Sequence, residues 1–175
     1  MTNCKGFNAV SRGDARVLIL GTLPGAESLR QQQYYAKKQN SFWKIMGELV
    51  GAYPDLPYEA RLEQLVNSGI ALWDVCAEAE RKGSLDSDIR MPVTNDFAAF
   101  FKHHGDIKLI CFNGQPAEKL FCRYVQPGLS EPILSLPRRS LPSTSPANAR
   151  MRFEVKLARW RDALEQFIKP NNVNG

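Results

Sequence analysis

The stretch RVLILGTLPG, residues 16–25, sets the fold class of this chain. Its first half is a short apolar run bounded by Gly13 and Gly21, a pattern typical of a buried β-strand. Its second half is a Gly-Thr-Leu-Pro-Gly loop that follows the run without a spacer. Neither GxxxxGK[ST] nor GxGxxG occurs in the loop, so it carries no nucleotide-binding fingerprint. The loop is therefore either a tight turn without a ligand or part of a site of another kind.

Strand and helix patterns alternate along the rest of the chain. Further strands are expected over residues 69–75, 107–112 and 132–136, and helices over 41–50, 58–66, 95–103, 114–124 and from 147 onward. This alternation predicts an α/β fold, a three-layer αβα arrangement with a four-stranded parallel sheet between helices. Residues 1–175 are expected to form a single domain, with its core over about residues 15–168.

Composition and charge narrow the classes of protein to consider. Lys and Arg number 23 against 18 Asp and Glu, and the net charge of +5 suits a polyanion such as nucleic acid without requiring one. No run approaches the roughly 20 apolar residues of a membrane helix, and the first residues lack a signal peptide's apolar core. A cytoplasmic protein without a membrane partner is therefore expected. The four cysteines form no CxxC and the two histidines are adjacent, so we expect neither metal nor cofactor.

Polar residues follow the predicted strands at the edge where parallel strands end, which is where such sheets bind ligands. Asp74 ends the second strand and is either a site residue or a helix cap. Asn113 follows the third strand and either satisfies the turn backbone or contacts a ligand. The loop SLPSTSPANA, residues 140–149, carries four hydroxyls, three of them between Pro142 and Pro146, ahead of the last helix and Arg150. Such a loop suits phosphate oxygens, and the alternative is a cluster of capping residues.

Five segments together resemble the uracil-DNA glycosylase superfamily, in its hypoxanthine-DNA glycosylase branch. They are GTLPGAESL at 21–29, QYYAKKQNSFW at 33–43, GIALWDVCAEAERKGSLDSDI at 69–89, FNG at 112–114 and LPSTSPANA at 141–149. The resemblance implies a uracil-DNA-glycosylase-like fold and a monofunctional enzyme that hydrolyses the N-glycosidic bond of a deaminated base, with hypoxanthine the expected one. It also implies a monomer that acts at the nucleoid on double-stranded DNA with a flipped lesion nucleotide.

The resemblance assigns roles to individual residues. Leu23 stands where mismatch-specific relatives have a water-activating Asn, so the task is expected to pass to Asn40. Tyr35 stands where relatives place the aromatic residue that stacks on the base, and Asp74 where the base edge is contacted. The expected catalytic residues are Asn40 and Asp74, and the expected base-binding residues are Thr22, Leu23, Tyr35 and Asn113. The expected DNA-binding residues are Ser143, Thr144, Ser145, Asn148, Arg150, Lys37 and Lys38.

The chain departs from the branch pattern at two places. Lys37-Lys38 replace a His-Pro pair that is frequent in the branch, and Leu141 stands where many relatives have His or Asn. No histidine is therefore expected to protonate the leaving base. Two alternatives of the same fold stay open: an enzyme directed at uracil, whose N3–H is also a donor, and a non-catalytic protein that binds lesions. An unrelated nucleotide-binding α/β protein is disfavoured by the missing phosphate fingerprint.

Overall fold

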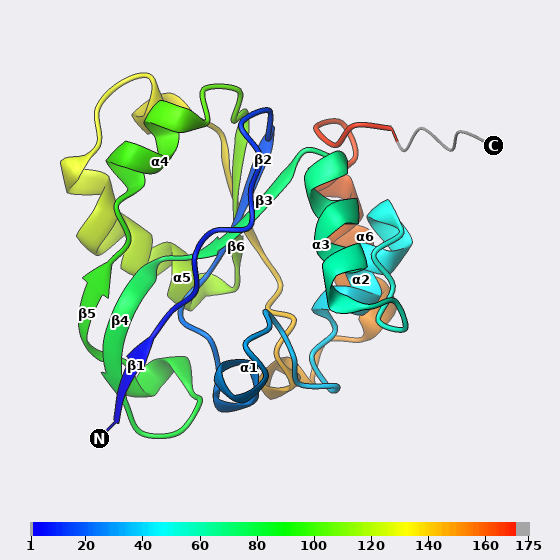
Figure 1. Ribbon diagram of the computed structural model, residues 1–175, viewed down its shortest axis with the longest axis horizontal. Helices are drawn as coiled ribbons and strands as arrows, with labels where there is room; N and C mark the ends of the chain where they lie inside the picture. The colour runs from blue at the N-terminus through cyan, green and yellow to red at the C-terminus, as the bar shows by residue number, and fades with distance from the viewer. Residues whose placement is uncertain (1, 171–175) are drawn as a thin grey trace.

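A four-stranded parallel sheet forms the centre of the computed structural model, which describes residues 2–170 (Figure 1). The strand order is β3-β2-β6-β7. The strands are β2 (Val17–Gly21), β3 (Ile70–Asp74), β6 (Leu109–Asn113) and β7 (Arg138–Leu141). The three predicted strands over residues 16–20, 69–75 and 107–112 are confirmed, because continuous apolar runs are what a sheet covered on both faces requires.

Helices cover both faces of this sheet, as Figure 1 shows, and the three-layer prediction is confirmed. They are α1 (Ala26–Gln31), α2 (Phe42–Val50), α3 (Tyr58–Asn67), α4 (Phe97–His103), α5 (Gln115–Leu120) and α6 (Phe153–Leu164). Alternate residues of β2 point to opposite faces. Val17 and Ile19 pack into a core with α2, α3 and α6, and Leu18 and Leu20 pack into a second core with α4 and α5. Within residues 2–170, no helix is long and apolar enough to cross a membrane.

The predicted fourth strand over residues 132–136 is wrong. That segment holds a 3-10 turn, η4 (Ile133–Ser135), and the strand is β7, which pairs with β6 from the Ile110–Arg138 register onward. The sequence of β7 is polar, and Arg139 and Ser140 are exposed because β7 is an edge strand. An edge strand needs no continuous apolar run, so the apolar segment beside it misled the prediction.

The last helix also begins later than predicted. Residues 146–148 form only a 3-10 turn, η5 (Pro146–Asn148), and α6 begins at Phe153. The hydroxyl-rich loop is therefore not the N-terminus of the amphipathic helix. Lys156, a charged residue of α6, is buried at 5% exposure, and burial lowers its pKa.

A second, antiparallel sheet was not predicted. Its order is β1-β4-β5, formed by β1 (Thr2–Lys5), β4 (Cys76–Arg81) and β5 (Arg90–Thr94). Only Val75 separates β4 from β3, so one extended segment serves both sheets. The loop between β4 and β5, residues 82–89, includes the 3-10 turn η1 (Asp86–Asp88) and approaches the end of β2. The alternation of small and charged residues in β4 gave too weak an apolar signal to predict a strand.

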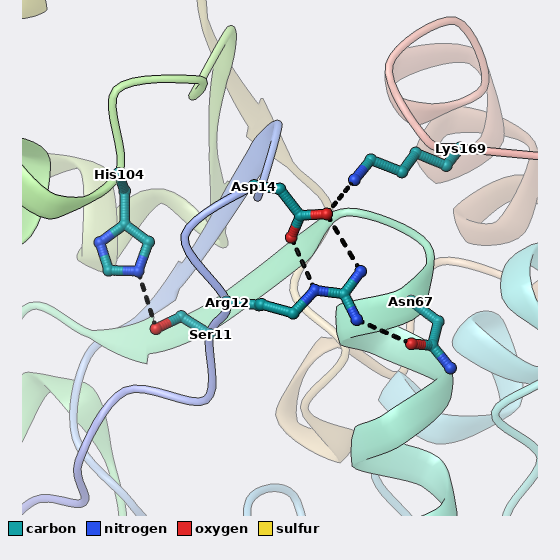
Figure 2. Close-up of polar contacts among 6 residues, drawn as sticks. All are labelled: Ser11, Arg12, Asp14, Asn67, His104 and Lys169. Atoms are coloured by element: carbon teal, nitrogen blue, oxygen red, sulfur yellow. Dashed lines mark hydrogen bonds and ion pairs between the residues drawn. The ribbon is translucent and has the colours of Figure 1, made fainter.

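The opposite edge of the parallel sheet, where the strands begin, is closed by a network of polar contacts (Figure 2). The Arg12 guanidinium donates to both oxygens of Asp14, at 2.7 and 3.1 Å, and to Asn67 Oδ1 at 2.9 Å. Lys169 pairs with the same Asp14 carboxylate, so hydrogen bonds from Arg12 and Lys169 lower the pKa of Asp14. These contacts join the segment before β2 to α3 and to the segment after α6. They lie at the end of the sheet opposite to its carboxyl edge.

Candidate active site

A cleft of about 890 Å³ opens at the carboxyl edge of the parallel sheet. Its walls come from the loop after β2, residues 34–40, the ends of β3 and β6, residues 84–86, and residues 143–147. The predicted site residues in its lining are Thr22, Leu23, Tyr35, Lys37, Lys38, Asn40, Asp74, Asn113, Ser143, Thr144 and Ser145. Asn148 and Arg150 do not line it. The structure thus brings together residues at the carboxyl ends of the parallel strands, where such sheets bind ligands, with the segments 34–40 and 84–86 from elsewhere in the chain.

Asp74 is the last residue of β3, paired in register with Gly21 of β2, and it is 4% exposed. Its Oδ2 has no hydrogen-bond partner among residues 2–170. Burial, and then the charge of Asp86, raise the pKa of Asp74 to about 7, although Arg81 opposes the shift. A buried polar atom without a partner is rare, and in a cleft it indicates a group reserved for a ligand. The carboxyl donates a hydrogen bond below pH 7 and only accepts above it.

Tyr35 brings a second polar atom to the same place. A β-carbon on Gly21 would lie 2.6 Å from Asp74 Oδ1 and 2.9 Å from the Tyr35 hydroxyl oxygen, so only glycine leaves room for both. The Tyr35 hydroxyl is buried without a hydrogen bond among the described residues, and burial, followed by the charge of Asp74, raises its pKa. The Tyr35 ring stacks on Phe42 with centroids 4.1 Å apart. A base therefore has only the opposite face of this ring to stack on.

Asn40 lies just before α2, and a hydrogen bond of its side chain to the first residue of that helix holds it in place. Its Oδ1 accepts a hydrogen bond from the Phe42 backbone N–H at 2.9 Å. An amide oxygen has two lone pairs, so one remains to hold a water molecule. The next residue, Ser41, donates to the Thr144 carbonyl from its backbone N–H at 3.0 Å and from its hydroxyl at 3.2 Å. These bonds join the Asn40 segment to the loop that follows β7.

Asn113 and Thr144 form a buried reciprocal pair. Asn113 Nδ2 donates to Thr144 Oγ1, and the Thr144 N–H donates to Asn113 Oδ1, both at 2.9 Å. Asn113 thus joins the end of β6 to the hydroxyl-rich loop while lining the cleft. In that loop the Ser143 and Ser145 hydroxyl oxygens each accept one backbone N–H, both at 3.2 Å. Their O–H groups remain able to donate to phosphate oxygens.

Sequence reasoning missed the contribution of the loop between β4 and β5. Thr22 donates its hydroxyl hydrogen to the Asp86 carboxylate. The residue Asp86 as a whole is exposed, but its carboxyl group lies among protein atoms at the cleft. This burial of the carboxyl group raises the pKa of Asp86. Arg81 is 1% exposed, and its guanidinium donates to the carbonyls of Gly83, Leu23 and Pro24. The only signal in the sequence was an arginine in a polar stretch, which is ordinary for a surface loop.

The parallel sheet and the cleft at its carboxyl edge are compared here with known protein families. Residues 7–167 match the model of the uracil DNA glycosylase superfamily, and the chain belongs to this family. It is 39% identical to the "Hypoxanthine DNA glycosylase" of Methanosarcina acetivorans, over 83% of this chain and 89% of the relative. It is 32% identical to the protein of the same name from Methanosarcina barkeri, over 93% of this chain and 98% of the relative. A solution NMR structure from Methanosarcina acetivorans, described as a candidate uracil DNA glycosylase, is also similar, with a TM-score of 0.77, 34% identity, and coverage of 95% of this chain and 99% of that one.

Proposed function

We propose that this DNA glycosylase removes hypoxanthine from deoxyinosine in double-stranded DNA by hydrolysis. The observation that carries the proposal is the buried, unpartnered Asp74 Oδ2 in the cleft that Asn40 also lines. Two relatives named for hypoxanthine, at 39% and 32% identity, support the choice of base. Hypoxanthine presents N1–H as a donor, and the ionised Asp74 carboxylate accepts it.

The reaction requires the nucleotide to rotate out of the duplex, because the glycosidic bond is unreachable inside the stack. Asn40 then holds a water molecule against the sugar carbon C1′ through its remaining lone pair. The water oxygen bonds to C1′ while the C1′–N9 bond breaks, and the base leaves with the bonding electrons. The attacking water loses one proton to solvent and the base takes up one proton from solvent, so one water is consumed for each base released. Backbone N–H groups of the turn over residues 21–25, in which Pro24 has none to offer, lie in the cleft wall and stabilise the negative charge that develops on the base. No lysine is required as a nucleophile, so the product is an intact strand with an abasic site.

Incubation with lesion duplexes followed by hot alkali tests this function, because alkali cleaves DNA at abasic sites. Deoxyinosine and deoxyuridine duplexes with different labels, competed in one reaction, should give faster cleavage at deoxyinosine. Faster cleavage at deoxyuridine would favour the alternative enzyme, since uracil N3–H is a donor of the same kind. Tight binding without any abasic product would favour the non-catalytic lesion-binding alternative.

We propose further that the protein acts as a monomer in the cytoplasm, on DNA whose lesion nucleotide is flipped, and that residues 15–168 form the glycosylase core. The agreement of that range with the family match over residues 7–167 supports the last point. Sedimentation of the protein alone and with one equivalent of a short lesion duplex should give a one-to-one complex. A two-to-one complex would contradict the monomer.

The activity should rise with pH as Asp74 loses its proton. A group with a pKa of about 7 is roughly one-tenth ionised at pH 6 and nine-tenths at pH 8, so kcat/KM for deoxyinosine duplex should increase about ninefold over this interval. Measurement of kcat/KM between pH 5.5 and 9 checks the rise, and Asp74→Asn should flatten it. A rate that falls with pH instead would identify the protonated carboxyl as the active form, acting as a proton donor to the base.

Arg150→Ala should weaken binding to lesion and lesion-free duplexes about equally. Arg150 is exposed and outside the cleft, next to the loop of Ser143 and Ser145, which suits a phosphate contact beside the flipped nucleotide. Loss of one phosphate contact should flatten the slope of log affinity against log salt by about one unit. Arg16→Ala is the matched control, because Arg16 is exposed at the opposite edge of the sheet, just before β2. An unchanged slope for Arg150→Ala would move the phosphate contact to Lys37 and Lys38.

A further inference from the structure

The hydroxyl group of Tyr35 lies beside the Asp74 carboxyl group in the cleft. A β-carbon built on Gly21 would lie 2.9 Å from the Tyr35 oxygen and 2.6 Å from Asp74 Oδ1, so the two side chains meet at the same glycine. Neither the Tyr35 oxygen nor Asp74 Oδ2 has a hydrogen-bond partner within residues 2–170. Most buried polar atoms in proteins are paired, so two unpaired groups at one glycine in a cleft indicate a ligand that contacts both.

The backbone around Tyr35 holds its side chain in this position. Tyr35 has a φ of 53°, in the left-handed region that bulky residues rarely adopt. The Tyr34 carbonyl accepts a hydrogen bond from Trp43 Nε1 at 2.9 Å. The Ala36 N–H donates to Ser28 Oγ at 3.1 Å. An unfavourable conformation of this kind persists where the surrounding structure fixes it, and such conformations are concentrated at functional sites.

Stacking on a base accounts for the ring of Tyr35 and leaves its hydroxyl unexplained. One face of the ring already packs on Phe42, with centroids 4.1 Å apart. A base on the opposite face would leave the hydroxyl oxygen, which lies in the plane of the ring, without a partner. A phenylalanine would stack there equally well. The buried hydroxyl therefore requires a partner at the edge of the ring, on the side where Asp74 lies.

The hydroxyl of Tyr35 is a hydrogen-bond donor at neutral pH. Burial, and then the charge of Asp74, raise the pKa of Tyr35, and the Asn113 side chain opposes this rise without cancelling it. The ionised Asp74 carboxylate only accepts, so the two side chains present one donor beside one acceptor. Hypoxanthine has the complementary groups on adjacent atoms of one edge, the acceptor O6 and the donor N1–H. Adenine has the reverse arrangement, a donor N6 amino group and an acceptor N1.

We propose that the Tyr35 hydroxyl donates a hydrogen bond to O6 of the base while Asp74 accepts one from N1–H, so that the pair selects the N1–H/O6 edge of hypoxanthine. The bond to O6 strengthens during the reaction, because the electrons of the broken C1′–N9 bond place negative charge on O6. The inference rests on the proposed function for the identity of the base. Tyr35 contacts the base itself, so it contributes both to the choice of base and to its departure.

The test combines Tyr35→Phe with a duplex that carries 6-thiohypoxanthine, in which N1–H is kept and O6 is replaced by sulfur, a weak acceptor. Single-turnover excision from this duplex and from a deoxyinosine duplex is measured above pH 8, where Asp74, with a pKa of about 7, is ionised. Tyr35→Phe should be slower than wild type by about 10- to 100-fold on deoxyinosine, and by no more than about threefold on the thio base. The variant keeps the ring that packs on Phe42.

Tyr124→Phe is the matched control, because it removes the hydroxyl of a tyrosine that is 42% exposed and outside the cleft lining. It should equal wild type on both duplexes. Equal rates of wild type and Tyr35→Phe on deoxyinosine would overturn the proposal, since the ring alone would then suffice. Equal deficits of Tyr35→Phe on the two duplexes would also overturn it, because the hydroxyl would then support the cleft without contacting O6.

Failure of the proposed function is a separate result, in which wild type forms no abasic product from the deoxyinosine duplex. Fluorescence anisotropy then decides on Tyr35, because binding of the base needs no chemistry. Wild type should bind the deoxyinosine duplex more tightly than the thio duplex, and Tyr35→Phe should bind the two equally. The same preference for deoxyinosine in wild type and in Tyr35→Phe, or no preference in wild type, would contradict a hydrogen bond from Tyr35 to O6.

Discussion

Asn40→Ala is expected to lower the single-turnover rate of hypoxanthine excision by about 100-fold or more, with the affinity for lesion DNA nearly unchanged. Leu23, which the resemblance places where mismatch-specific relatives have the water-activating side chain, has no polar atom in its side chain. The Asn40 amide lines the cleft and is held there by the Phe42 N–H, with one lone pair left for water. The measurement is cleavage of a labelled deoxyinosine duplex with enzyme in excess, beside fluorescence anisotropy for binding.

Gln166→Ala is the control for Asn40→Ala, because it removes an exposed amide that lies after α6 and outside the cleft lining, and it should leave the rate near wild type. Asn40→Ala also loses the hydrogen bond to the Phe42 N–H at the start of α2, a cost of about 1 kcal/mol that the fold should tolerate. Circular dichroism and the unfolding midpoint check this. An Asn40→Ala rate within a few-fold of wild type would remove Asn40 from the mechanism.

Asp74→Asn should change the choice of base more than the affinity for DNA. The amide both donates and accepts, whereas the ionised carboxylate only accepts, so preference for a base with N–H at this edge should weaken. We expect a lower ratio of hypoxanthine to adenine cleavage, because adenine presents an acceptor N1 where hypoxanthine has N1–H, measured in one competition between deoxyinosine and deoxyadenosine duplexes above pH 8. An unchanged ratio would mean that Asp74 supports the cleft and does not contact the base.

The same substitution should stabilise the folded protein at alkaline pH. The pKa of Asp74 is raised in the folded state from an ordinary 3.8 to about 7, so the folded chain binds a proton that the unfolded chain releases. Stability contributed by this proton is present at low pH and is lost as the pH rises from about 4 through 7. Above pH 7, Asp74→Asn should therefore gain up to about 4 kcal/mol in the free energy of unfolding, and almost nothing at pH 4. Guanidinium unfolding at pH 4 and pH 8 checks this, and equal stabilities of the two proteins at pH 8 would contradict it.

The sequence by itself determined three of the four strands of the central sheet and the composition of most of the cleft. Continuous apolar runs predicted β2, β3 and β6, because strands covered by helices on both faces must be apolar throughout. Parallel strands end at one edge, so Asp74 and Asn113 had to lie near the loop after β2. The resemblance added Tyr35 and Asn40, and the structure places both in the lining of the same cleft.

Only the tertiary structure decided the remaining features, because they depend on neighbours far away in the chain. The polar edge strand β7 and the second sheet form through backbone pairing with neighbouring strands, and their sequences show no regular pattern of apolar residues. An aspartate in water is ionised at neutral pH, whereas burial and the nearby Asp86 raise the pKa of Asp74 to about 7. Asp86 has no distinguishing sequence pattern, and its carboxylate lies at the cleft because it accepts a hydrogen bond from Thr22, a residue far earlier in the chain. The local sequence shows which residues are apolar and therefore buried. The protonation state of a side chain, and its position relative to the cleft, depend on the groups that folding brings into contact with it.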